Sequence, residues 1–180
     1  MYSLLHGFWE YLVAKEVVYV LVVGRQEAGK TTFIEQLKAI QRGDHSYTPP
    51  PPRSTVGLNT AKVVTGPVSV TFWDLGGHPS LRPIWDQYIP DANAVVFVVD
   101  STESAEEAAE TRRVLQALVS RPDFPRVPLL LVANKQDTAG AHDATAVRER
   151  LDCPELHARP TVFAVQPVGA RGGTGVEDCM

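Results

Sequence analysis

A short stretch after the first apolar run combines glycines, a lysine and hydroxyl groups at a spacing that suits phosphate binding. It reads GRQEAGKTT over residues 24–32 and matches the pattern G-x-x-x-x-G-K-[ST]. Two glycines would let backbone amides and the start of a helix face an anion. We expect Lys30 to reach the β and γ phosphates and to serve catalysis, and the Thr31 hydroxyl to ligate Mg²⁺. The residues predicted to touch the nucleotide are Gly24, Arg25, Gln26, Glu27, Ala28, Gly29, Lys30, Thr31 and Thr32. The alternative is a glycine-rich turn without a ligand.

A second polar cluster, NKQD at residues 134–137, follows another apolar run. A strand's carboxyl end is where ligands bind in open α/β sheets. Asp137 can accept from the N1–H and the N2 amine of guanine, whereas adenine would leave this buried charge unpaired. Lys135 would cover the base with its aliphatic stem. Asn134 would either bond the imidazole edge of the base or tie this loop to the phosphate loop. We therefore predict guanine as the base.

The elements that must position these residues alternate between strand and helix. Short apolar, β-branched runs predict strands at 17–23, 94–100, 128–134 and 161–165. Helical patterns lie at about 30–42, 103–119 and 143–151. A turn at 65–67 predicts a hairpin between 58–64 and 68–73. We expect one α/β P-loop NTPase domain with a mostly parallel six-stranded sheet, one antiparallel edge strand, and helices on both faces.

Composition narrows the class of protein. The chain has 180 residues, 44% of them apolar, which suits a single domain. Its net charge of −4, from 17 basic and 21 acidic residues, offers no basic surface for nucleic acid. Only Cys153 and Cys179 are present, so no disulfide framework can be inferred and a reducing compartment is favoured. The longest apolar run, 17–23, is too short to span a bilayer. We expect a monomeric cytoplasmic protein.

The sequence resembles the Ras-like small GTPases, and among them the ADP-ribosylation factor (Arf) family. The phrases that carry the resemblance are GRQEAGKTT, STVGLN, WDLGGHPSLRPIWDQY and NKQD, and they cover nearly the whole chain. MYSLL, TVGLN and FWDLGG look closest to the Arf-related protein branch, which acts at the trans-Golgi. The resemblance implies a Ras-like GTPase domain at 16–180, preceded by an amphipathic helix at 1–15.

The resemblance also implies roles for residues that sense the third phosphate. Thr55 would be the switch I threonine that completes the Mg²⁺ shell only with GTP. Asp74 would hold Mg²⁺ through water, and the Gly77 amide would sense the γ-phosphate and act in catalysis. Such contacts order two loops, and hydrolysis would release them. The amide of Ala170 would meet the guanine O6, although the usual neighbouring serine is replaced.

His78 stands where most of the family carries a catalytic glutamine. The GTPase of the endoplasmic-reticulum exit coat and the translational GTPases have histidine there. A neutral imidazole can orient an attacking water, so we predict a water-positioning, catalytic role for His78. Pro79 biases His78 away from helical angles and suits the first helical position, which makes His78 a predicted helix cap. The alternative is an exposed loop histidine.

Three further features depart from the family pattern, namely Gln26, Glu27 and the end of the chain. Gln26 and Glu27 stand where the family usually has Asp and then Asn or Ala. A carboxylate beside a polyphosphate is unfavourable, so we expect Glu27 to turn outward, toward Arg25 or Arg53. The third is the end of the chain at Met180, where the family would begin a long final helix. We expect this helix to be missing or truncated, and therefore either low stability or an incomplete sequence.

Apolar residues repeat at helical spacing near the N-terminus, namely Met1, Leu4, Leu5, Phe8, Trp9 and Leu12. They predict an amphipathic helix that packs on the domain or binds a membrane surface; the resemblance implies that GDP and GTP select between the two. Tyr2 replaces the glycine that N-myristoylation requires. A second stripe, Leu81, Ile84, Trp85 and Tyr88, is either core or an effector surface.

These features favour a GTP/GDP switch that recruits effectors to membranes in vesicle-mediated protein transport, at the Golgi. It would associate reversibly with the membrane and hydrolyse GTP slowly, because no arginine finger is evident. An exchange factor and an activating protein are implied, with effectors at switch I and switch II. A GTP-binding scaffold with negligible hydrolysis is the alternative. A P-loop ATPase or nucleotide kinase is disfavoured by NKQD.

Guanine selectivity can be tested on the purified protein. We expect nucleotide released on denaturation to be GTP or GDP, and added GTP to bind more tightly than ATP, because only guanine satisfies Asp137. Chromatography of the released nucleotide and competition binding measure this. Tighter ATP binding would favour the ATPase or kinase instead.

Overall fold

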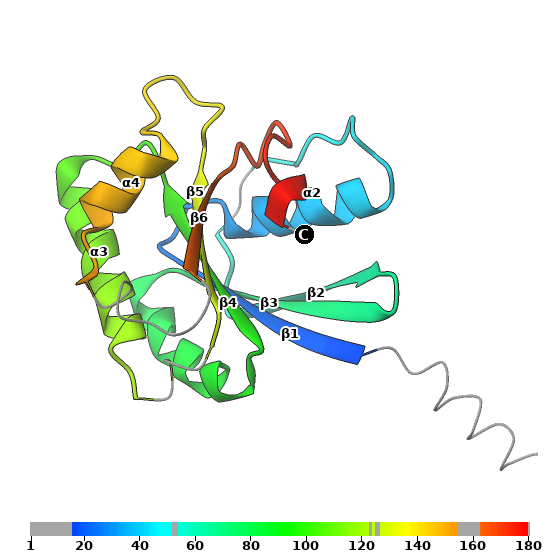
Figure 1. Ribbon diagram of the computed structural model, residues 1–180, viewed down its shortest axis with the longest axis horizontal. Coiled ribbons are helices and arrows are strands. Elements are labelled where there is room, and N and C mark those ends of the chain that lie inside the picture. The colour runs from blue at the N-terminus through cyan, green and yellow to red at the C-terminus, as the bar shows by residue number, and fades with distance from the viewer. Residues whose placement is uncertain (1–15, 52–53, 123, 125–126, 155–162, 180) are drawn as a thin grey trace, which may run out of the picture.

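The computed structural model describes residues 16–51, 54–122, 124, 127–154 and 163–179, and six strands form its one sheet (Figure 1). The strands are β1 (Glu16–Val23), β2 (Leu58–Thr65), β3 (Val68–Leu75), β4 (Ala94–Asp100), β5 (Leu129–Asn134) and β6 (Phe163–Pro167). Their order is β2-β3-β1-β4-β5-β6, and only β2 runs antiparallel to its neighbour. The predicted six-stranded α/β architecture with one antiparallel edge strand is confirmed.

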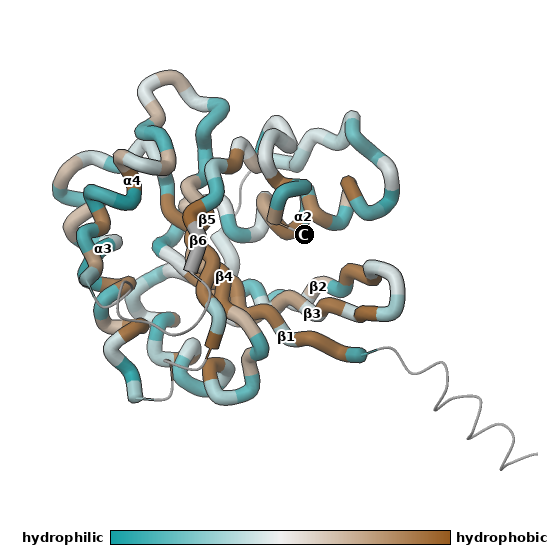
Figure 2. The backbone as a smooth tube through the Cα atoms, in the orientation of Figure 1, coloured by the Kyte–Doolittle hydropathy of each residue, from teal (hydrophilic) through white to brown (hydrophobic). Residues whose placement is uncertain are grey.

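The central strands are runs of mainly apolar residues, as the hydropathy colours of Figure 2 show. In β1, Val20 and Val22 pack on one face, whereas Leu21 and Val23 pack on the other. Side chains alternate along a strand, so covering both faces requires a run of apolar residues instead of an alternating pattern. The two layers of core therefore explain the uninterrupted VLVV at the end of β1.

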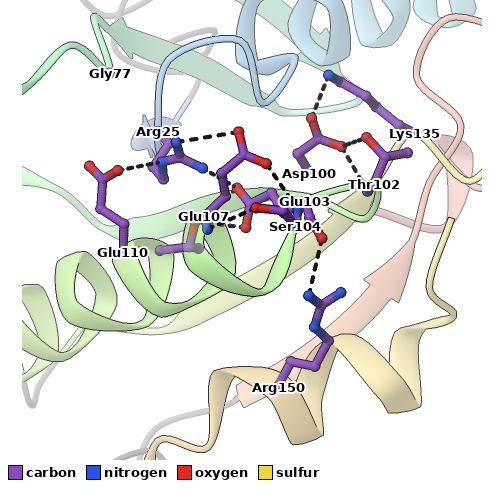
Figure 3. Close-up of polar contacts among 12 residues, drawn as sticks. Arg25, Gly77, Asp100, Thr102, Glu103, Ser104, Glu107, Glu110, Lys135 and Arg150 are labelled. Carbon is purple, nitrogen blue, oxygen red and sulfur yellow. Dashed lines mark hydrogen bonds and ion pairs between the residues drawn. The ribbon is translucent and has the colours of Figure 1, made fainter.

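Helices cover both faces, as predicted. The helix α2 (Lys30–Gln41) packs Phe33, Ile34 and Leu37 against one face. The helices α3 (Ala105–Val119) and α4 (Ala144–Leu151) lie on the other face (Figure 1). The helix α3 begins two residues later than the predicted range, because Ser104 and Glu107 form a capping box. This cap places the acidic start of α3 beside the loop after β1 (Figure 3).

The stripe after β3 lies on a 3₁₀ helix, Pro79–Gln87. Trp85 is only 4% exposed and belongs to the core, and its indole N–H donates to the Gly76 carbonyl at 3.2 Å. Ile84 and Tyr88 pack partly buried against the same core. At Trp85 the core interpretation of this stripe is therefore confirmed, and the buried ring anchors the segment.

Several predictions concern the ends of the chain. The N-terminal helix at 1–15 lies outside the described residues, as do Arg53 and Met180. Before Met180, Glu177–Cys179 forms a single 3₁₀ turn. Within the described ranges, none of the helices combines the length and apolar character needed to cross a bilayer.

Candidate guanine nucleotide site

The loop between β1 and α2 is shaped by close contacts at its glycines. At Gly24, where φ is 140°, an added Cβ would lie 2.3 Å from the Val98 carbonyl oxygen. At Gly29, where φ is 93°, it would lie 2.1 Å from Nδ2 of Asn134. Both positions require glycine, because their angles and their neighbours exclude a side chain. The loop therefore sits directly against β4 and β5.

Lys30 lies inside this loop and is 5% exposed. Its Nζ donates to the carbonyl oxygens of Gly24 at 3.2 Å and Arg25 at 2.8 Å. Burial lowers the pKa of Lys30 from 10.5 to about 8, against the opposing charge of Asp74. An anion in the loop would favour the charged form and raise the pKa of Lys30 again. The placement agrees with a phosphate-binding lysine.

Three predicted magnesium ligands meet beside Lys30. The Oγ1 atoms of Thr31 and Thr55 are 2.8 Å apart, and the Thr31 hydroxyl donates to Oδ2 of Asp74 at 2.6 Å. These residues come from the start of α2, the loop before β2 and the end of β3.

The remaining oxygen of this group, Asp74 Oδ1, is buried without a hydrogen-bond partner. Burial raises the pKa of Asp74 above its ordinary value. A carboxylate with an unused buried oxygen beside two hydroxyls is the oxygen donor set that Mg²⁺ prefers. The residues present therefore fit a magnesium ion, with Thr31, Thr55 and Asp74 as the groups that would hold it.

Gly77 brings the segment after β3 against the phosphate loop. A Cβ added to Gly77 would lie 2.3 Å from the Gly24 carbonyl oxygen and 2.5 Å from the Gln26 amide nitrogen. The neighbouring Gly76 amide donates to the Gly57 carbonyl at 3.0 Å. The segments that hold Thr55 and Gly77 thus dock together at the loop, and only a glycine backbone can approach so closely.

Asn134 ties the base loop to two other loops. Its Nδ2 donates to the Ala28 carbonyl at 2.8 Å, and its Oδ1 accepts from the Ala170 amide at 3.0 Å. Of the two predicted roles for Asn134, the structure places it in the loop-tying one. The Ala170 amide already has this partner, and its predicted contact with guanine O6 stays a prediction.

The other two base-loop residues also have partners. Lys135, with φ at 67°, donates from Nζ to Oδ2 of Asp100 at 2.5 Å (Figure 3). Oδ2 of Asp137 accepts from the Gly172 amide at 3.2 Å. These contacts orient an aliphatic stem and a carboxylate at the carboxyl end of β5, where the sequence places them.

His78 caps the 3₁₀ helix, as predicted. Its φ and ψ of −62° and 140° are extended, Pro79 follows at the first helical position, and the Ser80 amide donates to Nδ1 at 3.3 Å. Nδ1 also lies 2.8 Å from the Ser80 hydroxyl oxygen. The side chain is exposed, so the structure combines the cap with the exposed-histidine alternative. Catalysis by His78 stays a prediction.

The two phosphate-loop positions that depart from the family pattern have exposed side chains. Gln26 and Glu27 are exposed, and Glu27 has a φ of 62°. The Arg25 guanidinium instead pairs with three acidic residues at the start of α3, namely Glu103 at 3.0 Å, Glu107 at 3.8 Å and Glu110 at 3.3 Å (Figure 3). The Arg25 side chain thus faces this acidic group, and the predicted nucleotide contact of Arg25 stays a prediction. Thr32 is half-buried in the first turn of α2.

Sequence reasoning missed this acidic group. The spacing indicated part of it, because Glu107 and Glu110 are three residues apart and lie on one face of α3, whereas Glu103 precedes its N-cap, Ser104. Nothing local pairs these glutamates with Arg25, since Arg25 and Glu103 are 78 residues apart.

The lowered pKa of Lys30 predicts a pH effect on the ligand-free protein. Between pH 8 and 10.5 the unfolded chain binds more protons than the folded chain, so the free energy of unfolding should rise with pH. We expect this rise to exceed that of Lys30→Met by on the order of 2–3 kcal/mol, measured by denaturant unfolding. Lys62→Met, which removes an exposed lysine, should keep the wild-type slope. An unchanged slope in Lys30→Met would contradict the assignment.

Comparisons with known proteins agree with this geometry. The ADP-ribosylation factor family model matches residues 4–180. ADP-ribosylation factor-related protein 1 of Bos taurus is 38% identical over 180 residues, which cover 99% of this chain and 89% of the relative. The Homo sapiens protein of that name shows the same identity and coverage.

A solved structure is similar over most of its length. It is the Arl6 BBS3 small GTPase from Trypanosoma brucei with bound nucleotide analogue GppNp. Its TM-score is 0.76 at 31% identity, over 90% of this chain and 92% of that chain. The glycine-shaped loop, the buried lysine and the guanine motif thus occur together in one chain. This chain belongs to the ADP-ribosylation factor (Arf) family of small GTPases, which are GTP-hydrolysing enzymes.

Proposed function

We propose that this protein is a magnesium-dependent GTP/GDP switch, in which Thr55 and Gly77 sense the third phosphate. The observation that carries the proposal is the cluster of Thr31, Thr55 and Asp74 with one buried oxygen unpartnered. The Thr55 hydroxyl meets this cluster only because the loop before β2 is docked against the start of α2. A ligand that favours this docked arrangement shifts the population toward it.

The phosphate loop would bind the nucleotide through its amides and through Lys30, whose ammonium would leave the loop carbonyls for the β and γ phosphates. Thr31, Thr55 and Asp74 would hold Mg²⁺, which would supply positive charge to offset the charge that develops on the phosphates. Asp137 would read guanine, with Lys135 covering the base. Asn134 would hold the base loop and the phosphate loop together. Since the Ala170 amide donates to Asn134, it would contact guanine only by sharing this hydrogen bond.

We further propose that unaided hydrolysis is slow. Arg25, in the phosphate loop, and Arg82, after β3, both pair with Glu110 of α3. We therefore expect neither of these two arginines to contact the phosphates during hydrolysis. An arginine supplied by an activating protein accelerates GTPases of this kind. The resemblance to Arf-related proteins supports an exchange factor, effectors at the two switches, and reversible attachment to Golgi membranes through residues 1–15.

Asp74→Asn tests the metal proposal. We expect Mg²⁺ to raise the unfolding temperature of the wild-type GDP complex by about 5 °C or more, and to have no effect in Asp74→Asn. The amide keeps the size of the carboxylate but lacks its charge. Calorimetry with and without Mg²⁺ measures the difference, and Asp91→Asn, at an exposed aspartate, should behave as wild type. An equal Mg²⁺ effect in Asp74→Asn would refute the proposed ligand set.

A scaffold that holds GTP without hydrolysing it is the second candidate. The observation that favours the scaffold is that Nδ1 of His78 is already engaged with Ser80 in the helix cap. If the imidazole positions water through Nε2, His78→Ala should slow single-turnover GTP hydrolysis by roughly ten-fold or more, while His45→Ala should not. Indistinguishable rates would remove His78 from catalysis, and a negligible wild-type rate would favour the scaffold.

A further inference from the structure

One carboxylate links the phosphate loop to the segment after β3. Oε1 of Glu110 accepts from Nη2 of Arg82 at 2.7 Å, and Oε2 of Glu110 lies 3.3 Å from Nε of Arg25. Arg82 also donates from Nε to the Gly77 carbonyl at 3.3 Å. Glu110 thus contacts two arginines, one with each carboxylate oxygen, and one of them, Arg82, also bonds the backbone of Gly77. We call this set of contacts the bridge.

The loop end of this bridge is firmly anchored. The Arg25 side chain is 14% exposed and pairs with Glu103, whose side chain is 5% exposed. The Thr111 hydroxyl lies 2.8 Å from each carboxylate oxygen of Glu103. Arg150 of α4 donates to the Glu103 carbonyl at 3.1 Å (Figure 3). The start of α3 is therefore a frame that is held by contacts in which Arg82 takes no part.

The other end of the bridge lies on the segment that must move in a switch. Gly77 packs directly on Gly24 and Gln26, and this approach defines the docked arrangement. The Arg82 contacts to Gly77 and Glu110 connect that segment to a helix outside both switches. Interactions that exist in only one of two arrangements favour that arrangement by their free energy.

We propose that Glu110 is a positioning residue that favours the docked arrangement of Gly77 and so raises the preference for GTP over GDP. This inference rests on the proposed function, because it assumes that the docked arrangement is the one GTP selects. The Arg82 hydrogen bond lowers the pKa of Glu110, so the carboxylate is charged at neutral pH. Arginine suits the role, because its planar guanidinium can bond Gly77 and Glu110 at once.

The test measures dissociation constants for GDP and for a non-hydrolysable GTP analogue, both with Mg²⁺. Glu110→Gln should lower the preference for the GTP analogue by roughly five-fold, mainly through weaker analogue binding. Glu106→Gln is the matched control, since it makes the same change at an exposed position of the same helix. The difference between wild type and Glu110→Gln should shrink at high salt, because the pair is partly exposed.

A second variant separates positioning from general loss of structure. Arg82→Gln should reduce the preference by a similar factor, and the double variant should lose no more than either single variant, because both act through one contact. Equal weakening of both nucleotides, or a preference equal to that of Glu106→Gln, would overturn the inference while leaving the proposed function intact. Failure of the wild-type protein to bind either nucleotide would overturn both.

Discussion

Close packing of backbone on backbone determines the shape of the nucleotide site. Gly24 lies against the Val98 carbonyl, Gly29 against the Asn134 amide, and Gly77 against Gly24. No side chain would fit at any of these contacts. Because the partners come from β4, the end of β5 and the segment after β3, the shape of the phosphate loop depends on these strands lying in their observed order.

Burial makes this loop costly to leave without a ligand. Desolvation lowers the pKa of Lys30 and raises that of Asp74, so both groups are shifted toward their neutral forms. Asp74 also retains an oxygen without a partner. A polyphosphate and a cation would relieve these costs together, which links ligand binding to the stability of the fold.

Ion pairs at the rim of the site connect its loops to neighbouring elements of the fold. The exposed position of Glu27 keeps an additional carboxylate hydrated, where its repulsion toward phosphate is weakest. Arg25 has become part of the α3 frame, and Lys135 pairs with Asp100 at the end of β4. These pairs tie the phosphate loop to the residues at and before the start of α3, and the base loop to the end of β4.

Local sequence was sufficient to predict the elements and most of the residues that gather at the site. Apolar runs predict buried strands, GRQEAGKTT predicts a turn followed by a helix, and Pro79 predicts the cap at His78, because each depends on residues close in the chain. Partner choice among distant polar groups could not be predicted in this way. Asn134 forms hydrogen bonds with Ala28 and Ala170, and Arg25 pairs with Glu103 and Glu110. These partners meet only because the folded sheet brings distant parts of the chain within hydrogen-bond distance. Tertiary structure decides such contacts, since their free energy depends on three-dimensional separation and burial, which sequence spacing does not specify.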